Sequence, residues 1–297
     1  MKITIIGESN IDIAVVPHSN ANSKGCTPGN IAFHYGGVAR NIAHNLCLLG
    51  HEVQLVSVFG NDRFATQLIN DCQRLGIDLS FSSQFKETKS PIFLSFNDNT
   101  GNMISAVSDV DINERMDLNW LLGKMDAINK ADIVVADTLL SAEALAYLID
   151  QCKAPLFIDT VSPGKAMRFA NAIKQSKKNN VFALKCNRAE ATQITGENDA
   201  VLAAKKLYDS GINNVYLTIG SSGVIFCSEG LVSTYPVIPS QVVNVTGSGD
   251  AFFAGVIHAF TIGAESAESI QYGLKMAKAN CEVDDTVCPV LPADFCI

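Results

Sequence analysis

Short runs of β-branched and other apolar residues alternate with amphipathic segments along almost the whole chain. Several of the short runs are apolar on both faces, which is typical of parallel strands covered by helices on both sides. We expect strands at Lys2–Ile6, Val53–Phe59, Asp132–Ala136, Leu156–Asp159, Val181–Lys185, Asn214–Ile219 and Gly223–Cys227. We expect helices at Val38–Leu49, Phe64–Leu75, Ala142–Gln151, Arg188–Thr195, Ala200–Asp209, Ala251–Phe260 and Ala267–Cys281. This alternation predicts an α/β protein with an open, doubly wound, mostly parallel sheet flanked by helices.

Two stretches interrupt the alternation. Residues 13–35 are rich in Asn, Ser, Gly and Pro, and residues 88–107 alternate apolar and polar positions around a turn at Asn97–Gly101. We interpret both as strand-like insertions that form a small β-strand lid over a ligand cleft. In open α/β sheets that cleft lies beyond the carboxyl ends of the strands. No linker or internal repeat divides the pattern, so residues 1–297 are expected to form a single domain.

The composition excludes several classes of protein. With 47% hydrophobic and 18% charged residues, the chain can bury a core and is not disordered. Its 30 acidic and 22 basic residues give a net charge of −8, which argues against a nucleic-acid or anionic membrane surface. The longest uncharged apolar stretch, Ala251–Ile262, is shorter than the roughly 20 residues that a bilayer span needs. Nine cysteines without a CxxC pair and no signal-peptide pattern lead us to expect a cytoplasmic protein.

The strongest local motif is VTGSGDAFFAG at residues 245–255, just before an apolar helix. Glycines on both sides of Ser248 let successive backbone N–H groups point into one concavity, and the helix N-terminus adds partial positive charge. The segment therefore predicts an anion site. Asp250 is either a carboxylate that caps the helix or a base beside a bound phosphate, and its spacing leaves both open. The chain has neither GxxxxGK[ST] nor GxGxxG, so a P-loop NTPase and a standard dinucleotide fold are excluded.

Two further groups of residues suit a polar ligand. Gly36 and Gly37 open a predicted helix and permit close backbone approach, and Asn41 lies one turn into that helix. Asn10 and Asp12 follow the first strand and suit hydrogen bonds to sugar hydroxyls. A glycine turn and ordinary turn chemistry are the alternatives for these two groups.

Taken together, these residues resemble the ribokinase-like (PfkB) carbohydrate kinase family over almost the whole chain. The matching features are Asp12, the GG…N segment at 36–41, the Asn187-x-x-Glu190 pair and the TGSGDAFFAG segment. The departures from the family pattern are Ala65 for Gly, Cys186 for Pro, Asn244 for Asp and Ser248 for Ala. The resemblance implies a ribokinase-like fold and an enzyme that transfers the γ-phosphoryl group of ATP to a primary hydroxyl of a sugar or nucleoside.

The resemblance also implies a role for each candidate residue. Asp250 would be the general base, and the backbone amides of Gly247, Ser248 and Gly249 would form an anion hole for the transferring phosphoryl group. The implied substrate-binding residues are Asn10, Asp12, Gly36, Gly37 and Asn41, with Asp12 and Asn41 on the ribose hydroxyls. Those implied for ATP are Asn187, Thr218, Gly220, Gly223 and Asn280, and those for Mg²⁺ are Asn187 and Glu190. A K⁺ ion near the glycine loop is implied as well, with Asn244 as the departure there.

Shorter segments resemble one branch of that family, the pseudouridine kinases. They are Thr27-Pro28-Gly29 before GGVARNIA, DxVSxxK at 159–165, Asp109-x-x-Ile112 and TVCP at 286–289. This implies pseudouridine as the acceptor, with Asn10 and Lys165 facing the base and a homodimer formed through the lid. The expected partners are ATP and a small sugar or nucleoside, without nucleic acid or membrane. The alternatives are another sugar or nucleoside kinase of the family, such as a ribokinase, and a non-catalytic sugar- or nucleotide-binding regulator.

Overall fold

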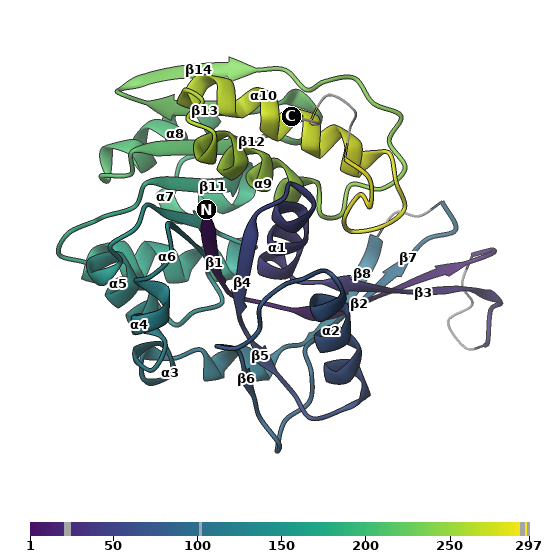
Figure 1. The fold of residues 1–297 in the computed structure, drawn as a ribbon. Coiled ribbons are helices and arrows are strands. Elements are labelled where there is room, and N and C mark those ends of the chain that lie inside the picture. The colour runs from purple at the N-terminus through teal and green to yellow at the C-terminus, as the bar shows by residue number, and fades with distance from the viewer. Residues whose placement is uncertain (21–24, 101–102, 292–294, 296–297) are drawn as a thin grey trace.

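An eight-stranded sheet forms the centre of the computed structural model, which describes residues 1–20, 25–100, 103–291 and 295 (Figure 1). In spatial order its strands are β14 (Leu231–Tyr235), β13 (Val224–Ser228), β12 (Asn214–Thr218), β11 (Ala183–Asn187), β10 (Leu156–Asp159), β9 (Ile133–Asp137), β1 (Lys2–Ile6) and β4 (Glu52–Val56). The strands from β12 to β4 pair in parallel, and β13 and β14 add an antiparallel edge. The predicted mostly parallel sheet is confirmed.

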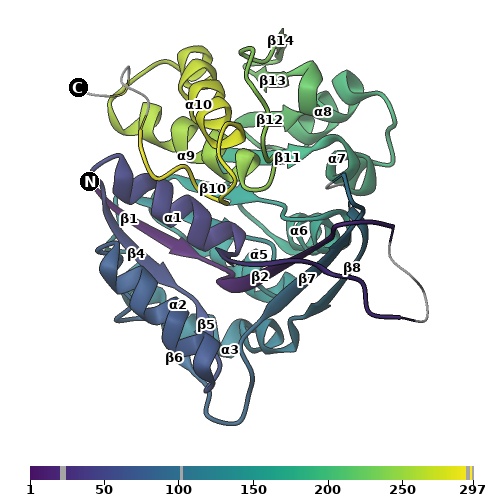
Figure 2. The ribbon, with the colours of Figure 1, turned by 90° about the vertical axis from the view of Figure 1, so that its right-hand side faces the viewer.

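Helices cover both faces of this sheet (Figures 1 and 2). On one face lie α1 (Val38–Leu48), α9 (Ser248–Thr261) and α10 (Ser266–Cys281); on the other lie α5 (Ala142–Gln151), α6 (Pro163–Gln175), α7 (Arg188–Thr195) and α8 (Ala200–Asp209). The remaining helices are α2 (Arg63–Arg74), α3 (Leu118–Leu122) and α4 (Met125–Ile128), with short 3-10 turns η1 (Asp111–Arg115) and η2 (Gly220–Ser222). The sheet needs helices on both faces because successive residues of β1 point to opposite sides and are both apolar. Ile5 packs in the core beneath α1 and α9, and Ile6 packs in the core on the other face.

Several elements differ from the prediction. The segment Val53–Phe59 is not one strand: it breaks at Ser57, and β5 (Val58–Phe59) pairs instead with β6 (Ser83–Gln84). The elements β6, β14, α3, α4 and α6 were not predicted. In α6, Pro163 occupies the first turn, where Pro suits a helix. The other predicted strands and helices agree with the structure to within three residues at each end.

A four-stranded lid sheet lies beside the carboxyl edge of the large sheet (Figure 2). It consists of β3 (Gly29–Gly36), β2 (Asn10–Pro17), β7 (Ile92–Asn97) and β8 (Met103–Asp109), in that order. Both predicted insertions contribute to it, but β2 begins at Asn10, earlier than expected. Asn10 and Asp12 therefore belong to a lid strand, and are not turn residues after β1. Residues 21–24 and 101–102, within the two insertions, lie outside the described residues.

Across the described ranges, none of the helices combines the length and the apolar character that a membrane crossing requires.

Candidate active site

The carboxyl ends of β1, β9 and β10 and the lid enclose a cavity of about 390 Å³. Its polar lining includes these residues that the sequence singled out: Asn10, Asp12, Asn41, Lys165 and Asp250, together with the backbone of Gly37 and Gly247. Its apolar lining comes from Val38, Phe93, Val110, Leu139 and Val161. Such a mixture suits a small ligand with a hydroxyl-rich part and a flat apolar part.

Asp250 is held in place beside this cavity. It lies in the first turn of α9, where the helix dipole favours a negative charge, and it is buried. Asn41 Nδ2 donates a hydrogen bond to Asp250 Oδ2 at 2.9 Å. The amide of Asn41 is itself oriented by Arg40, whose Nη2 donates to Asn41 Oδ1 at 3.0 Å. Helix α1 therefore fixes the position of the Asp250 carboxylate.

A buried lysine that the sequence analysis did not identify lies behind Asp250. Lys185 Nζ is 2.9 Å from Asp159 Oδ2, and the ammonium also faces Asp250 and Glu190. Burial raises the pKa of Asp250 to about 7, with Lys185 acting in the opposite direction. Asp250 can therefore exchange a proton near neutral pH, as a general base requires. The sequence did contain a signal for this residue, because Lys185 is the single charged residue of strand β11 and lies at its centre.

The glycine loop packs tightly between this lysine and the C-terminal segment. Gly247 is the N-cap of α9 with φ +76°, and a Cβ there would overlap the carbonyl oxygen of Thr286. A Cβ on Gly249 would lie 2.9 Å from Lys185 Nζ. The first-turn amides of a helix have no partner within it, so they can bind an anion. The amide of Ser248 differs, because it donates to Val245 O at 3.2 Å.

Asn280, which the resemblance assigned to the nucleotide, is fully buried. Its Nδ2 donates to Thr246 O at 2.8 Å, and its Oδ1 accepts from Cys288 N at 3.1 Å. The side chain therefore holds the glycine loop against the C-terminal segment. A contact between Asn280 and the nucleotide stays a prediction.

A second cavity, of about 560 Å³, lies at the carboxyl ends of β11 and β12. Asn187, Thr218 and Gly220 line it, as expected for the nucleotide side. Gly223 is not among its lining residues. A Cβ on Gly223 would overlap the carbonyl oxygen of Tyr235, so this glycine permits close packing against the end of β14. The structure thus gives Gly223 a role in packing, and its contact with a nucleotide stays a prediction.

Asn187 and Glu190 bind each other. Asn187 is the N-cap of α7, Glu190 N donates to Asn187 Oδ1 at 3.0 Å, and the amide and Nδ2 of Asn187 both donate to the Glu190 carboxylate. Thr160 Oγ1 also donates to Glu190 Oε2, at 2.7 Å. Because each carboxylate oxygen has about two acceptor positions, Glu190 Oε1 keeps one for another donor. The pair forms a capping box at the start of α7, and Glu190 is buried.

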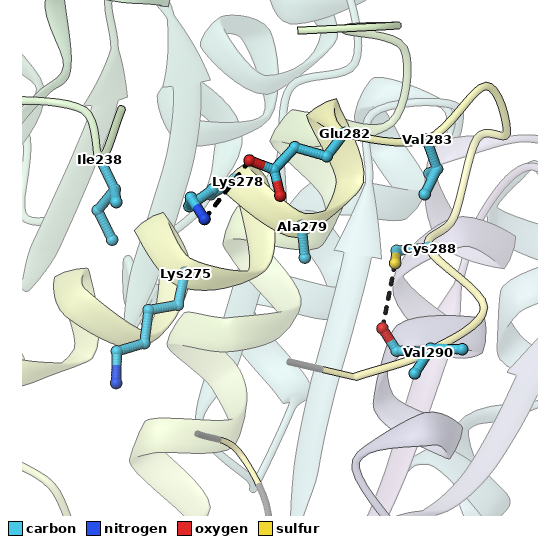
Figure 3. A pocket seen from close by; sticks show the side chains of 8 residues that line it. All are labelled: Ile238, Lys275, Lys278, Ala279, Glu282, Val283, Cys288 and Val290. Atoms are coloured by element: carbon cyan, nitrogen blue, oxygen red, sulfur yellow. Dashed lines mark hydrogen bonds and ion pairs between the residues drawn. The ribbon is translucent and has the colours of Figure 1, made fainter. Parts of the chain in front are cut away.

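A third cavity, of about 380 Å³, lies between the end of α10 and residues 283–290, with Ile238 opposite (Figure 3). Lys278 Nζ and Glu282 Oε1 form an ion pair on its wall, 3.4 Å apart. Cys288 lies across the cavity on the segment 283–290 and is joined through Asn280 to the glycine loop (Figure 3).

The fold and these cavities define a class of protein. A buried carboxylate at an anion-binding helix terminus, with a polar cavity beside it and a second cavity at the carboxyl ends of β11 and β12, suits transfer of a phosphoryl group to a hydroxyl.

Comparison with known proteins identifies the family. The sequence pattern of the pfkB family carbohydrate kinases matches residues 1–293, and the chain belongs to this family. It is 32% identical to a pseudouridine kinase of Escherichia coli over 94% of this chain and 91% of that protein. It is 24% identical to a pseudouridine kinase of Arabidopsis thaliana, over 99% and 94% of the two chains.

Solved structures show the same fold. The ribokinase of Thermotoga maritima matches with a TM-score of 0.84 at 18% identity, over 99% of this chain and 97% of that one. The ribokinase of Arabidopsis thaliana, solved in complex with ribose and ATP, matches with a TM-score of 0.80 at 18% identity, over 98% and 95%. The chain has the ribokinase fold and is an ATP-dependent sugar or nucleoside kinase.

Proposed function

We propose that this kinase acts as a single domain and transfers the γ-phosphoryl group of ATP to the 5′-hydroxyl of pseudouridine, forming pseudouridine 5′-phosphate. The observation that carries this proposal is that Asp250, Asp12, Asn41 and Lys165 line one cavity. The similarity to two pseudouridine kinases supports the choice of acceptor. Ribokinase activity is the second candidate, favoured by the shared fold and by the sugar-sized polar part of the cavity.

Asp12 and Gly36 would form the ribose site, and Asn10 beside them would face the base. Asn10 Nδ2 donates to Asp12 Oδ1 at 2.7 Å, which leaves Asp12 Oδ2 to accept from a ribose hydroxyl. Gly36 is required beside it, because a Cβ there would overlap the Asp12 carboxylate. Gly37 and Asn41 line the cavity between this site and Asp250. The ribose is thereby positioned with its primary hydroxyl toward Asp250.

Asp250 would accept the proton of the 5′-hydroxyl while the oxygen attacks the γ-phosphorus and ADP leaves. The first-turn amides at Gly249 and Asp250 and the loop at Gly247 would stabilise the negative charge on the transferring group. The buried Lys185 contributes a positive charge behind the same loop. Phe93 and Val110, from β7 and the end of the lid, cover the cavity and would exclude water from the reaction.

The nucleotide would occupy the second and third cavities described above. Asn187, Thr218 and Gly220 would face its phosphates and ribose, and the cavity beside Cys288 would take the adenine. Mg²⁺, which neutralises the phosphates when bound, would be held through water by Glu190 Oε1 and by Asn187, since Mg²⁺ usually keeps several waters. K⁺ would lie beside the glycine loop, where Asn244 Oδ1 accepts from Thr246 N at 2.9 Å and offers only a neutral oxygen.

The lid would also form a homodimer. Large apolar side chains exposed on one face of its strands are Ile31, Phe33, Phe96, Met103 and Val107. Side chains of this kind are seldom gathered on one exposed surface of a monomer, so a second copy of the chain is the expected partner. We place the enzyme in the cytoplasm, where ATP is available and where free thiols, such as those of the eight described cysteines, stay reduced.

The acceptor is tested with pseudouridine, uridine and ribose on the wild type and on Lys165→Ala. Lys165 lies in the first turn of α6 and lines the cavity, with its Nζ 3.6 Å from Glu114 Oε1. Loss of a hydrogen bond from its ammonium to a base carbonyl should lower kcat/KM for pseudouridine by about 10- to 100-fold. For ribose, which has no base, kcat/KM should change by less than about threefold.

Lys174→Ala, at an exposed position near the other end of α6, is the matched control and should leave both substrates unaffected. Equal losses on every acceptor would remove Lys165 from the base site. A wild type that prefers ribose or uridine to pseudouridine would refute the proposed acceptor and leave only the family assignment.

A further inference from the structure

Glu8 is a half-buried acid in the acceptor cavity that has no part in the mechanism above. It lies two residues after the end of β1 and lines the cavity together with Asn10 and Lys165. Its Oε1 accepts a hydrogen bond of 2.6 Å from Asn113 Nδ2, in the turn η1 that follows the lid. The second oxygen of Glu8 is thus left to accept a hydrogen bond from a ligand.

The backbone of Glu8 is fixed by two neighbouring elements. Its N–H donates to Asp137 Oδ2, at the end of β9, at 2.7 Å. Its carbonyl accepts from Arg40 N, in α1, at 3.1 Å. A Cβ on Gly37 would lie 2.5 Å from the same carbonyl, so the fit there is close. An acid held so rigidly from three sides can act as a specific hydrogen-bond acceptor.

The surroundings of Glu8 match one edge of a flat heterocycle. Lys165, a donor, lines the same cavity and acts on Glu8 electrostatically. Val38, Leu139 and Val161 supply apolar walls. Burial raises the pKa of Glu8 to about 7, opposed by the hydrogen bond from Asn113, while Asp12 raises it further and Lys165 lowers it. A ligand N–H would compensate the cost of holding this carboxylate ionised.

We propose that Glu8 determines the specificity for the carbon-linked base, by accepting a hydrogen bond from the ring N–H that pseudouridine has and uridine lacks. This inference rests on the proposed function. In uridine that nitrogen carries the ribose, so it has no hydrogen to donate. Asn113 acts as a positioning residue, because it binds one oxygen of Glu8 and directs the other toward the cavity. Lys165 then donates to a neighbouring carbonyl, so the two charged side chains match adjacent groups on the base.

The test compares Glu8→Gln with the wild type on pseudouridine, 1-methylpseudouridine and ribose. Gln can still accept from Asn113 through its oxygen, but it presents an NH₂ donor where the carboxylate accepted. We expect kcat/KM for pseudouridine to fall by about 10- to 100-fold, mainly through KM, because a charged acceptor is replaced by a donor. For ribose the change should stay below about threefold, since ribose does not reach Glu8.

The methylated nucleoside tests whether this ring N–H is the group that contacts Glu8. The wild type should discriminate strongly against 1-methylpseudouridine, whose methyl group replaces the hydrogen in question, and Glu8→Gln should lose most of that discrimination. Glu52→Gln is the matched control, because Glu52 is exposed at the start of β4, at the end of the sheet away from the cavity. That variant should behave as the wild type on all three acceptors.

Each outcome separates the inference from the proposed function. If the wild type prefers pseudouridine and Glu8→Gln keeps that preference, Glu8 does not contact the base and the inference fails alone. Equal losses on pseudouridine and ribose would make Glu8 a structural residue, which also overturns it. A wild type without preference for pseudouridine would overturn the proposed function together with the inference.

Discussion

Replacing Asp250 by Asn is expected to lower kcat by about 10²- to 10⁴-fold, the range typical for the loss of a general base. Asn has almost the same shape and can still accept the hydrogen bond from Asn41 Nδ2. It cannot take the proton of the attacking hydroxyl. Lys185 keeps its ion pair with Asp159, so the buried charge remains compensated. The fold and ATP binding should therefore change little.

The measurement is kcat at saturating ATP and acceptor, together with the Kd for ATP and the midpoint of urea unfolding. Asp126→Asn, an exposed acid in the first turn of α4, provides the same chemical change away from the site. A turnover of Asp250→Asn within about threefold of the wild type would show that Asp250 is not the base. A large loss of ATP binding would instead indicate a nucleotide-binding role.

Replacing Lys185 by Met is expected to lower the free energy of unfolding by about 3–5 kcal/mol, because it leaves the carboxylate of Asp159 buried without its counter-charge. Activity should respond through Asp250. Lys185 lowers the pKa of Asp250, so its removal raises that pKa further. Asp250 acts as a base only when ionised, and the acid limb of kcat/KM should move to higher pH.

Urea unfolding and the pH profile of kcat/KM measure these two effects separately. In the wild type the acid limb should lie near the Asp250 pKa of about 7. Lys185→Arg keeps the charge and should restore most of the wild-type profile, even where packing costs stability. A Lys185→Met variant with wild-type stability and an unmoved acid limb would show that Lys185 affects neither Asp159 nor Asp250.

Hydrophobic periodicity predicted the architecture well because the central strands are apolar on both faces. It failed where local signals opposed the tertiary structure. The expected helices left out α6, whose first turn contains Pro163 and Gly164 and places Lys165 at the cavity. Likewise, the polar sequence before residue 13 concealed that β2 begins at Asn10.

The site was predictable where its chemistry is local. The glycine loop and Asp250 are adjacent in sequence, and the helix that follows makes their geometry evident. Residues that act through strand order were missed: Lys185 meets Asp159 only because β10 and β11 are neighbours. The structural role of Asn280 was missed for a related reason, since its partners, Thr246 and Cys288, are distant backbone groups.

The central claim is that this chain phosphorylates the 5′-oxygen of pseudouridine. The most direct measurement is a phosphorus–proton NMR correlation on a reaction containing the protein, ATP, Mg²⁺ and pseudouridine, with a parallel sample that lacks Mg²⁺. We predict one new phosphomonoester, coupled to the 5′-methylene protons, formed in step with ADP and absent without Mg²⁺. ADP release without a phosphorylated nucleoside, or a phosphate coupled to a ring proton of the ribose, would contradict the account.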